Sequence, residues 1–95
     1  MSGQKNYSVS YYLEADGDIA SGTIYIMKII IVPDGGSGSV TIKEGGSSGD
    51  TKLYFKAHER SRVIDFRKSL KISETGSGNP YAEVSDCKVT FICEG

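Results

Sequence analysis

Residues 28–50 read KIIIVPDGGSGSVTIKEGGSSGD, a stretch in which β-forming runs alternate with glycine-rich runs. Residues 29–32 are all β-branched, and residues 39–44 alternate apolar and polar side chains with the two-residue period of a half-buried strand. The runs at 33–39 and 45–50 contain the Pro, Asp, Gly and Ser residues that tight reversals require. We therefore predict strands joined by hairpin turns in this stretch.

The same glycine-rich runs do not fit a phosphate-binding loop. Such a loop needs Gly-Lys-Ser or Gly-Lys-Thr followed by a helix, whereas GGSGSVTIKE has no lysine at that place and runs into a predicted strand. The glycines are therefore interpreted as turn residues.

The pattern of strands and turns continues on both sides of this stretch. About eight short β-forming runs are separated by Gly, Ser, Asn, Asp and Pro clusters at a spacing of roughly 10 residues. The runs cover residues 7–15, 23–32, 39–44, 52–57, 62–66, 69–73, 81–85 and 87–93. We predict an all-β fold, an antiparallel β-sandwich of jelly-roll or immunoglobulin-like topology, because regularly spaced short strands are typical of both.

The chain length predicts a single domain. With 95 residues there is room for one small core, so the domain is expected to cover residues 1–95, with residues 1–6 as a candidate flexible arm.

Residues 23–32, TIYIMKIIIV, are predicted to form the central strand because they are apolar on both faces. Strict alternation predicts that Lys28 interrupts the face made by Ile24, Ile26, Ile30 and Val32. A strand with two apolar faces favours a neighbour beyond its own core. We therefore expect a homo-oligomer or a module packed on a larger assembly.

The charge balance argues against a general role in binding two classes of partner. Eleven Lys and Arg residues against twelve Asp and Glu residues give a net charge of −1, too balanced for a general binder of nucleic acid or membrane surfaces. No apolar stretch approaches the roughly 20 residues needed to cross a bilayer. The start of the chain, MSGQKNYS, has no apolar segment of the secretory kind, so synthesis in the cytoplasm is expected.

Cys87 and Cys93 are predicted not to bridge each other. On one strand they share a face at a separation of about 20 Å, well beyond the roughly 7 Å between α-carbons that a disulfide allows. Two buried apolar side chains are the favoured interpretation, with an intermolecular bridge or a metal site as alternatives.

No set of residues predicts catalysis, a metal or a cofactor. His58 is the only histidine and lies beside Glu59, a common surface arrangement, and a zinc site that joins it to the two cysteines would lack a ligand. Asp16 and Asp18 resemble part of a calcium loop without its other oxygen ligands. The expectation is a protein that is not an enzyme.

Tyrosines and a local basic bias are the candidate features for partner contact. Tyrosine is enriched at protein interfaces, and the basic residues of 60–71 are countered locally by Glu59 and Asp65. Asp65 is expected to be exposed or paired with one of these arginines. Three interpretations of the basic residues stay open: a solvated face, a contact with an acidic protein surface, and, least favoured, nucleic acid. The candidate contact residues are Tyr12, Tyr25, Tyr54, Arg60, Arg62, Arg67 and Lys68.

The order of these elements resembles that of a known class of protein. The strand GTIYIMKIIIVPDGG, then GSVTIKEGG, then VIDF, resembles small β-sandwich virion proteins of tailed bacteriophages over residues 20–66. This resemblance implies a structural role in the virion, most simply as a capsid decoration or cement protein that binds the major capsid protein or another virion protein and stabilises the shell. Assembly would then take place in the host cytoplasm. The alternative is a carbohydrate- or receptor-binding module of a phage fibre or adhesin.

Overall fold

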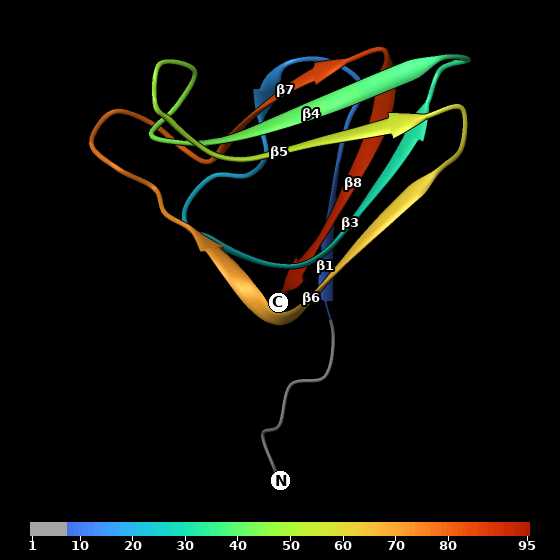
Figure 1. Ribbon diagram of the computed structural model, residues 1–95. Coiled ribbons are helices and arrows are strands. Elements are labelled where there is room, and N and C mark those ends of the chain that lie inside the picture. The colour runs from blue at the N-terminus through green and yellow to red at the C-terminus, as the bar shows by residue number, and fades with distance from the viewer. Residues whose placement is uncertain (1–7) are drawn as a thin grey trace, which may run out of the picture.

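The structure, a computed structural model, describes residues 8–95, which form eight strands in two antiparallel sheets (Figure 1). The strands are β1 (Ser8–Leu13), β2 (Gly17–Asp18), β3 (Ile24–Pro33), β4 (Ser37–Glu44), β5 (Asp50–His58), β6 (Arg62–Ile72), β7 (Tyr81–Ser85) and β8 (Cys87–Glu94). The predicted all-β sandwich is confirmed. The predicted arm at residues 1–6 and the first residue of the predicted strand at 7–15 lie outside the described residues.

The strand order is that of a jelly roll. One sheet has the order β1-β8-β3-β6 and the other β2-β7-β4-β5. The pairs β1–β8, β2–β7, β3–β6 and β4–β5 are therefore nested, as in one long hairpin folded over into two sheets. An immunoglobulin-like sandwich groups its first, second, fourth and fifth strands in one sheet, so that alternative does not describe this order.

Within residues 8–95 only one connection is a hairpin within a sheet, the turn at residues 45–49 between β4 and β5. The prediction of a second hairpin at residues 33–39 was wrong, because β3 and β4 belong to different sheets and residues 34–36 cross from one to the other. Local sequence predicts that the chain turns there but does not decide which strand the returning chain joins. Gly35 has a positive φ of 93°, as its role in a sharp turn requires.

The core is made by side chains that alternate inward on both sheets. Val40 and Ile42 are fully buried on β4, as predicted, and Phe91 is the largest fully buried residue. The remaining buried apolar residues are Ile19, Ala20, Ile24, Ile26, Ile29, Ile31, Ala57, Ile72, Ala82, Val84, Cys87, Val89 and Cys93. Figure 1 shows the sheets close together where β3 leads into β4 and further apart at the opposite end.

A bulge in β3 changes which side chains of this central strand share a face, relative to the prediction. The register to both neighbours shifts between Ile26 and Lys28, so one extra residue reverses the alternation beyond it. Ile29 and Ile31 consequently point into the core with Ile24 and Ile26, whereas Ile30 and Val32 face outward, so the prediction that Ile30 and Val32 share a face with Ile24 and Ile26 was wrong.

Two further strand predictions need correction. The runs at 62–66 and 69–73 are not separate strands, because β6 continues through both of them. The turn at residues 16–22 contains the additional two-residue strand β2, which pairs with β7. The total of eight strands within residues 8–95 matches the prediction because the merged strand and the additional strand offset each other.

Candidate functional site

Most of the predicted contact residues lie on one side of the sandwich, along the edge strands β5 and β6. Tyr54 is 55% exposed on β5, and Arg60, Arg62, Arg67 and Lys68 are exposed on or just before β6. Strand alternation from Arg60 to Arg62 would place both arginines on one face, but β6 begins only at Arg62, so they do not share a strand face.

The other two tyrosines lie elsewhere. Tyr25, 41% exposed, pairs with Lys71 across β3 and β6 and so borders the same side. Tyr12, 53% exposed, is on β1 at the far edge of its sheet, where its hydroxyl donates to Glu14 at 2.9 Å. Tyr12 is therefore not part of the surface that the other residues form.

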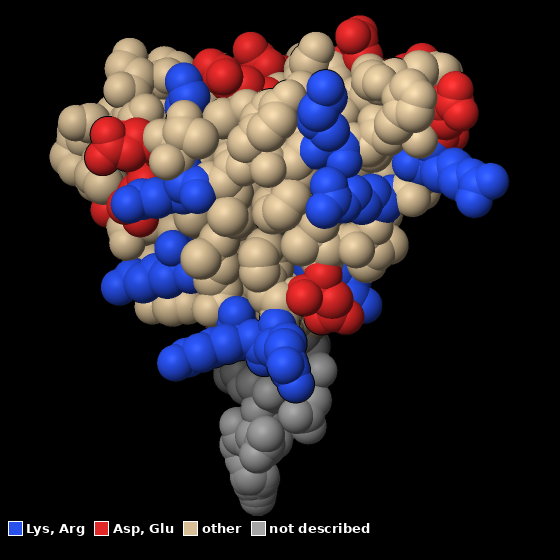
Figure 2. All heavy atoms as spheres, in the orientation of Figure 1, with Lys and Arg blue, Asp and Glu red and all other residues tan. Residues whose placement is uncertain are grey.

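The β5–β6 side is basic although the chain as a whole is not. Residues 50–72 hold seven Lys and Arg against three Asp and Glu, a net charge of +4, whereas the rest of the chain holds four and nine, a net charge of −5. In Figure 2 Lys and Arg side chains spread across the middle and base of this face, and most visible Asp and Glu side chains lie at its upper and left margins. We call this surface the basic side; it comprises Lys52, Lys56, Arg60, Arg62, Arg67, Lys68 and Lys71.

Arg62 connects the two sheet edges of the basic side. Its guanidinium donates to the backbone carbonyl of Lys56 at 2.9 Å and lies 5.5 Å from the centre of the Phe55 ring. Phe55 in turn meets Phe66 edge to face, with the ring centres 6.4 Å apart and the planes at 66°. Both rings are only partly buried, so an aromatic strip runs between the basic side chains, an arrangement suited to partner contact.

Asp65 is exposed, as predicted, but its partner is different from the prediction. Its carboxylate lies 3.9 Å from Lys28 Nζ on the neighbouring strand β3, directly opposite in register, rather than beside an arginine. Because 72% of the Asp65 side chain is exposed, this pair fixes local register more than it adds stability. The arginines of the basic side are therefore not neutralised by Asp65.

A hollow of about 390 Å³ lies beside Asp65, where β6 parts from β3. It is lined by Met27, Lys28, Asp65, Phe66, Arg67, Ser69, Ile92 and Glu94. We call it the β6 hollow. Of these residues, the sequence drew attention only to Lys28, Asp65 and Arg67. The lining residues come together because β3 and β6, which are far apart in the chain, have unequal numbers of residues at this place.

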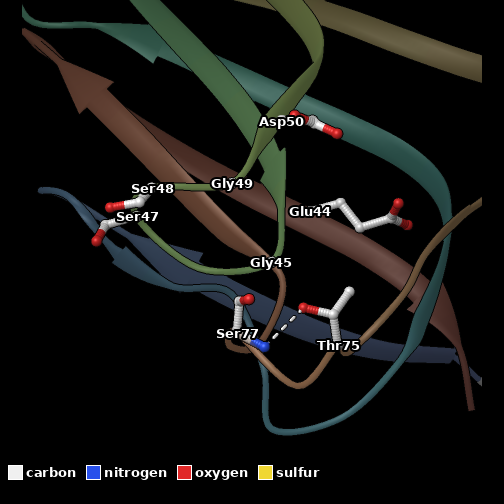
Figure 3. Close-up of a pocket in the computed structure, with 8 residues that line it drawn as sticks. All are labelled: Glu44, Gly45, Ser47, Ser48, Gly49, Asp50, Thr75 and Ser77. Atoms are coloured by element: carbon white, nitrogen blue, oxygen red, sulfur yellow. Dashed lines mark hydrogen bonds between the residues drawn. The ribbon is translucent and has the colours of Figure 1, made fainter.

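A second, polar hollow of about 420 Å³ lies at the loop end of the molecule (Figure 3). It is lined by Glu44, Gly45, Ser47, Ser48, Gly49, Asp50, Thr75 and Ser77. In Figure 3 the two carboxylates point to one side and the hydroxyls of Ser47 and Ser48 to the other. The polar groups therefore do not converge on a single point.

Glu44 is already engaged within the fold. It accepts a hydrogen bond from the backbone N–H of Ser73 at 2.7 Å and lies 3.4 Å from Lys52 Nζ. The backbone hydrogen bond, aided by Lys52, lowers the pKa of the Glu44 carboxyl below its ordinary value. This carboxylate ties β4 to the β6–β7 connection.

The groups considered for metal or acid–base chemistry have local roles. Asp16 accepts a hydrogen bond from the backbone N–H of Val84 at 2.7 Å, and Asp18 lies 3.4 Å from the amide of Asn79. Among residues 8–95, no group of three or more His, Cys, Asp and Glu residues is placed to hold a metal.

His58 ends β5 and shares a short hydrogen bond of 2.6 Å with Ser37 Oγ through Nδ1, while its Nε2 lies 3.7 Å from Glu59. These are the residue types of a hydrolytic triad, but the side chains of His58 and Glu59 are 72% and 73% exposed, and neither hollow contains them. The arrangement is that of a hydrated hydrogen-bonded pair.

Both cysteines are free and 1% exposed, which confirms that they do not bridge each other. Burial raises the pKa of the Cys93 thiol to about 11 and also raises that of Cys87. They act as small apolar core residues.

No helix among residues 8–95 is long and apolar enough to cross a membrane.

Comparisons with known proteins do not assign the chain to a family. Neither protein-family models nor curated protein sequences give a match. The functional argument therefore rests on the basic side and the two hollows.

Proposed function

We propose that this protein is a non-enzymatic structural component of a virion, a capsid decoration or cement protein that adheres to the major capsid protein through its basic side. Binding would stabilise the shell because a small domain seated across a joint adds buried area between neighbouring subunits. The proposed place of assembly is the host cytoplasm, and no cofactor takes part.

The separation of charge between the basic side and the rest of the molecule carries this proposal. A net charge of +4 on residues 50–72 attracts an acidic surface and orients the molecule during encounter, whereas the rest of the chain, at −5, is repelled by it. The partly exposed aromatic strip of Phe55 and Phe66 then supplies apolar area to bury in the contact.

The choice of a capsid as the partner is supported by the resemblance of residues 20–66 to small phage virion proteins. Jelly rolls are frequent among virion proteins and also among lectins, so the fold agrees with the proposal without selecting it.

The test is cosedimentation of the purified protein with assembled heads of a tailed phage that encodes it, at low and high salt. Lys68→Glu, on the basic side, is expected to weaken binding several-fold at low salt and to flatten the salt dependence, since rim charges act mainly through attraction during encounter. Lys88→Glu is the matched control because it changes the net charge equally at a half-exposed position on β8. Absence of cosedimentation at low salt, or equal loss with both variants, would contradict the proposal.

A second candidate function is a carbohydrate- or receptor-binding module of a fibre or adhesin. The polar hollow favours it, because hydroxyl and carboxylate side chains at loop tips suit a saccharide. It ranks second because those groups face different ways and Glu44 is engaged by Ser73 and Lys52. Chemical-shift changes confined to Ser47, Ser48 and Ser77 on titration with oligosaccharides would place this function first.

A further inference from the structure

The ladder between β3 and β6 is interrupted at one place. Ile26 pairs with Leu70 and Lys28 with Asp65, so Met27 alone faces residues 66–69. Figure 1 shows β6 bending there, at the base of the view where its colour turns from yellow to orange. Because β6 has three residues more than β3 at this place, it cannot follow β3, and the β6 hollow lies where the two strands part.

The β6 hollow has an apolar floor and a charged rim. The apolar lining is made by Met27, Phe66 and Ile92, all partly buried. Phe66 also packs against Phe55, so the floor continues into the aromatic strip of the basic side. An aromatic guest would therefore meet a ring edge and a thioether, both favourable neighbours for another ring.

The rim holds Lys28 and Arg67 against Asp65 and Glu94 and is formally neutral, but it adjoins the basic side, where residues 50–72 carry a net charge of +4. Asp65 is paired with Lys28, and Glu94 accepts a hydrogen bond from the hydroxyl of Ser69. Among residues 8–95, Arg67 forms no ion pair, and it lines the hollow directly. A carboxylate next to the guest would be attracted to Arg67.

The backbone beside the hollow can accept an extended chain. β6 is the edge strand of its sheet, and residues 66–69 have no ladder partner on β3. Edge strands bind extended segments through main-chain hydrogen bonds, while neighbouring pockets select the side chains.

We propose that the β6 hollow receives an aromatic side chain from an extended acidic segment of the protein partner. This inference rests on the proposed function and names the part of the partner that it recognises. The apolar floor selects the ring, Arg67 and the adjoining basic side attract the flanking carboxylates, and the open edge of β6 aligns the segment.

The test uses the full-length protein, labelled with ¹⁵N, and three blocked pentapeptides as probes. The first is Glu-Thr-Phe-Thr-Glu; the second has Ala in place of Phe, and the third has Lys in place of both Glu. We expect the first to shift the amide signals of Met27, Phe66 and Ile92, and the second to bind about tenfold more weakly because it buries no ring. The third should bind much more weakly than the first, since its lysines are repelled by Arg67 and the adjoining basic side.

Two protein variants separate the hollow from the surface around it. Ile92→Ala removes part of the floor and should weaken binding of the first peptide several-fold. Leu13→Ala truncates a partly buried apolar residue on β1, at the opposite edge of the same sheet and outside the hollow, and should leave binding unchanged. Comparable spectra of the two variants outside the substituted site show that both are folded.

Each contrary outcome has a definite meaning. If the phenylalanine peptide shifts none of the lining residues at millimolar concentration, the hollow is not a peptide site and the inference is wrong. If blocked phenylalanine alone binds as well as the peptide, the hollow takes a small aromatic molecule, which also contradicts it. If Ile92→Ala binds phage heads normally while Lys68→Glu does not, the inference fails but the proposed function stands.

Discussion

At Gly38 the two sheets approach each other too closely to leave room for a side chain. A Cβ atom at this position of β4 would lie 2.5 Å from Cys87 Cβ and 2.8 Å from the carbonyl oxygen of Asp86. Gly38→Ala should therefore lower the free energy of unfolding by about 1–3 kcal/mol, because neither the backbone nor a Cβ atom can move aside cheaply. Urea denaturation measures this.

Gly36 provides the control, since a Cβ there would have no neighbour within 4 Å. Gly36→Ala should change stability by less than about 0.5 kcal/mol. Equal stability of the two variants would show that the sheets separate easily at this end.

Cys93 makes the stability of the fold fall at alkaline pH. An unfolded thiol ionises near its ordinary pKa of 9.0, whereas burial raises the pKa of native Cys93 to about 11. The native state therefore holds the proton more tightly, so its stability is complete below pH 9.0 and falls as pH rises from there toward 11. Between pH 7 and 10 the wild-type protein should lose about 1 kcal/mol more than Cys93→Ala.

The measurement is chemical denaturation of both proteins at the two pH values. In the native protein at pH 8, neither Cys87 nor Cys93 should react with an aromatic disulfide reagent until the chain unfolds. Rapid reaction of one thiol under native conditions would contradict the burial on which this prediction depends.

At the scale of elements, Glu44 fastens the β6–β7 connection to β4. Glu44→Gln should cost about 1 kcal/mol at pH 7, because the backbone N–H of Ser73 loses a charged acceptor and Lys52 loses a counter-charge. The pKa of Glu44 is lowered from 4.5, so its contribution is present above pH 4.5 and is lost as pH falls through the native pKa. The difference from wild type should therefore shrink as the pH falls below 4.5.

Glu74→Gln is the control for this prediction, since Glu74 is exposed in the same connection and only its backbone N–H is engaged, by Thr23. Thermal denaturation from pH 3 to 7 would show the effect. A constant difference between Glu44→Gln and wild type across that range would mean that the carboxylate charge plays no part.

The elements also show how far the sequence alone could lead. Alternation predicted the inward residues of β4 correctly because each side chain there follows the pleat. Alternation failed in β3 because a single extra residue at Met27 reverses the two faces of the strand beyond it. The sequence does not indicate this reversal, because residues 29 and 30 are both isoleucine.

The candidate site was predictable only where residue type was sufficient. The arginines and lysines of 60–71 are visible as a charge bias in the sequence, and the structure places them on one side. The β6 hollow was not predictable, because it arises from unequal residue numbers between two strands that are far apart in the chain. Its floor residues Met27 and Ile92 look like ordinary strand residues.

At the scale of the whole molecule, the outer face of the β1-β8-β3-β6 sheet offers a candidate interface for the expected homo-oligomer. Tyr12, Thr90, Ile30 and Val63 lie side by side in register across its four strands. Tyr12 and Val63 are more than half exposed, and Val32 next to this row is 42% exposed. This row, apolar except for Thr90, stands where the sequence predicted a second apolar face, although the bulge supplies different residues for it.

We predict a closed oligomer that packs through this row and persists at high salt, because burial of apolar area is not screened by ions, unlike attraction between the basic side and an acidic surface. Val63→Lys should convert it to monomers, while Lys71→Glu, an exposed change on the same strand, should not. Light scattering after size exclusion at low and high salt gives the mass. A monomer at both salt concentrations would contradict this prediction, and the protein would then be a cement domain that forms its interface on the shell. An oligomer that dissociates at high salt would instead indicate that its subunits contact each other through charged surfaces.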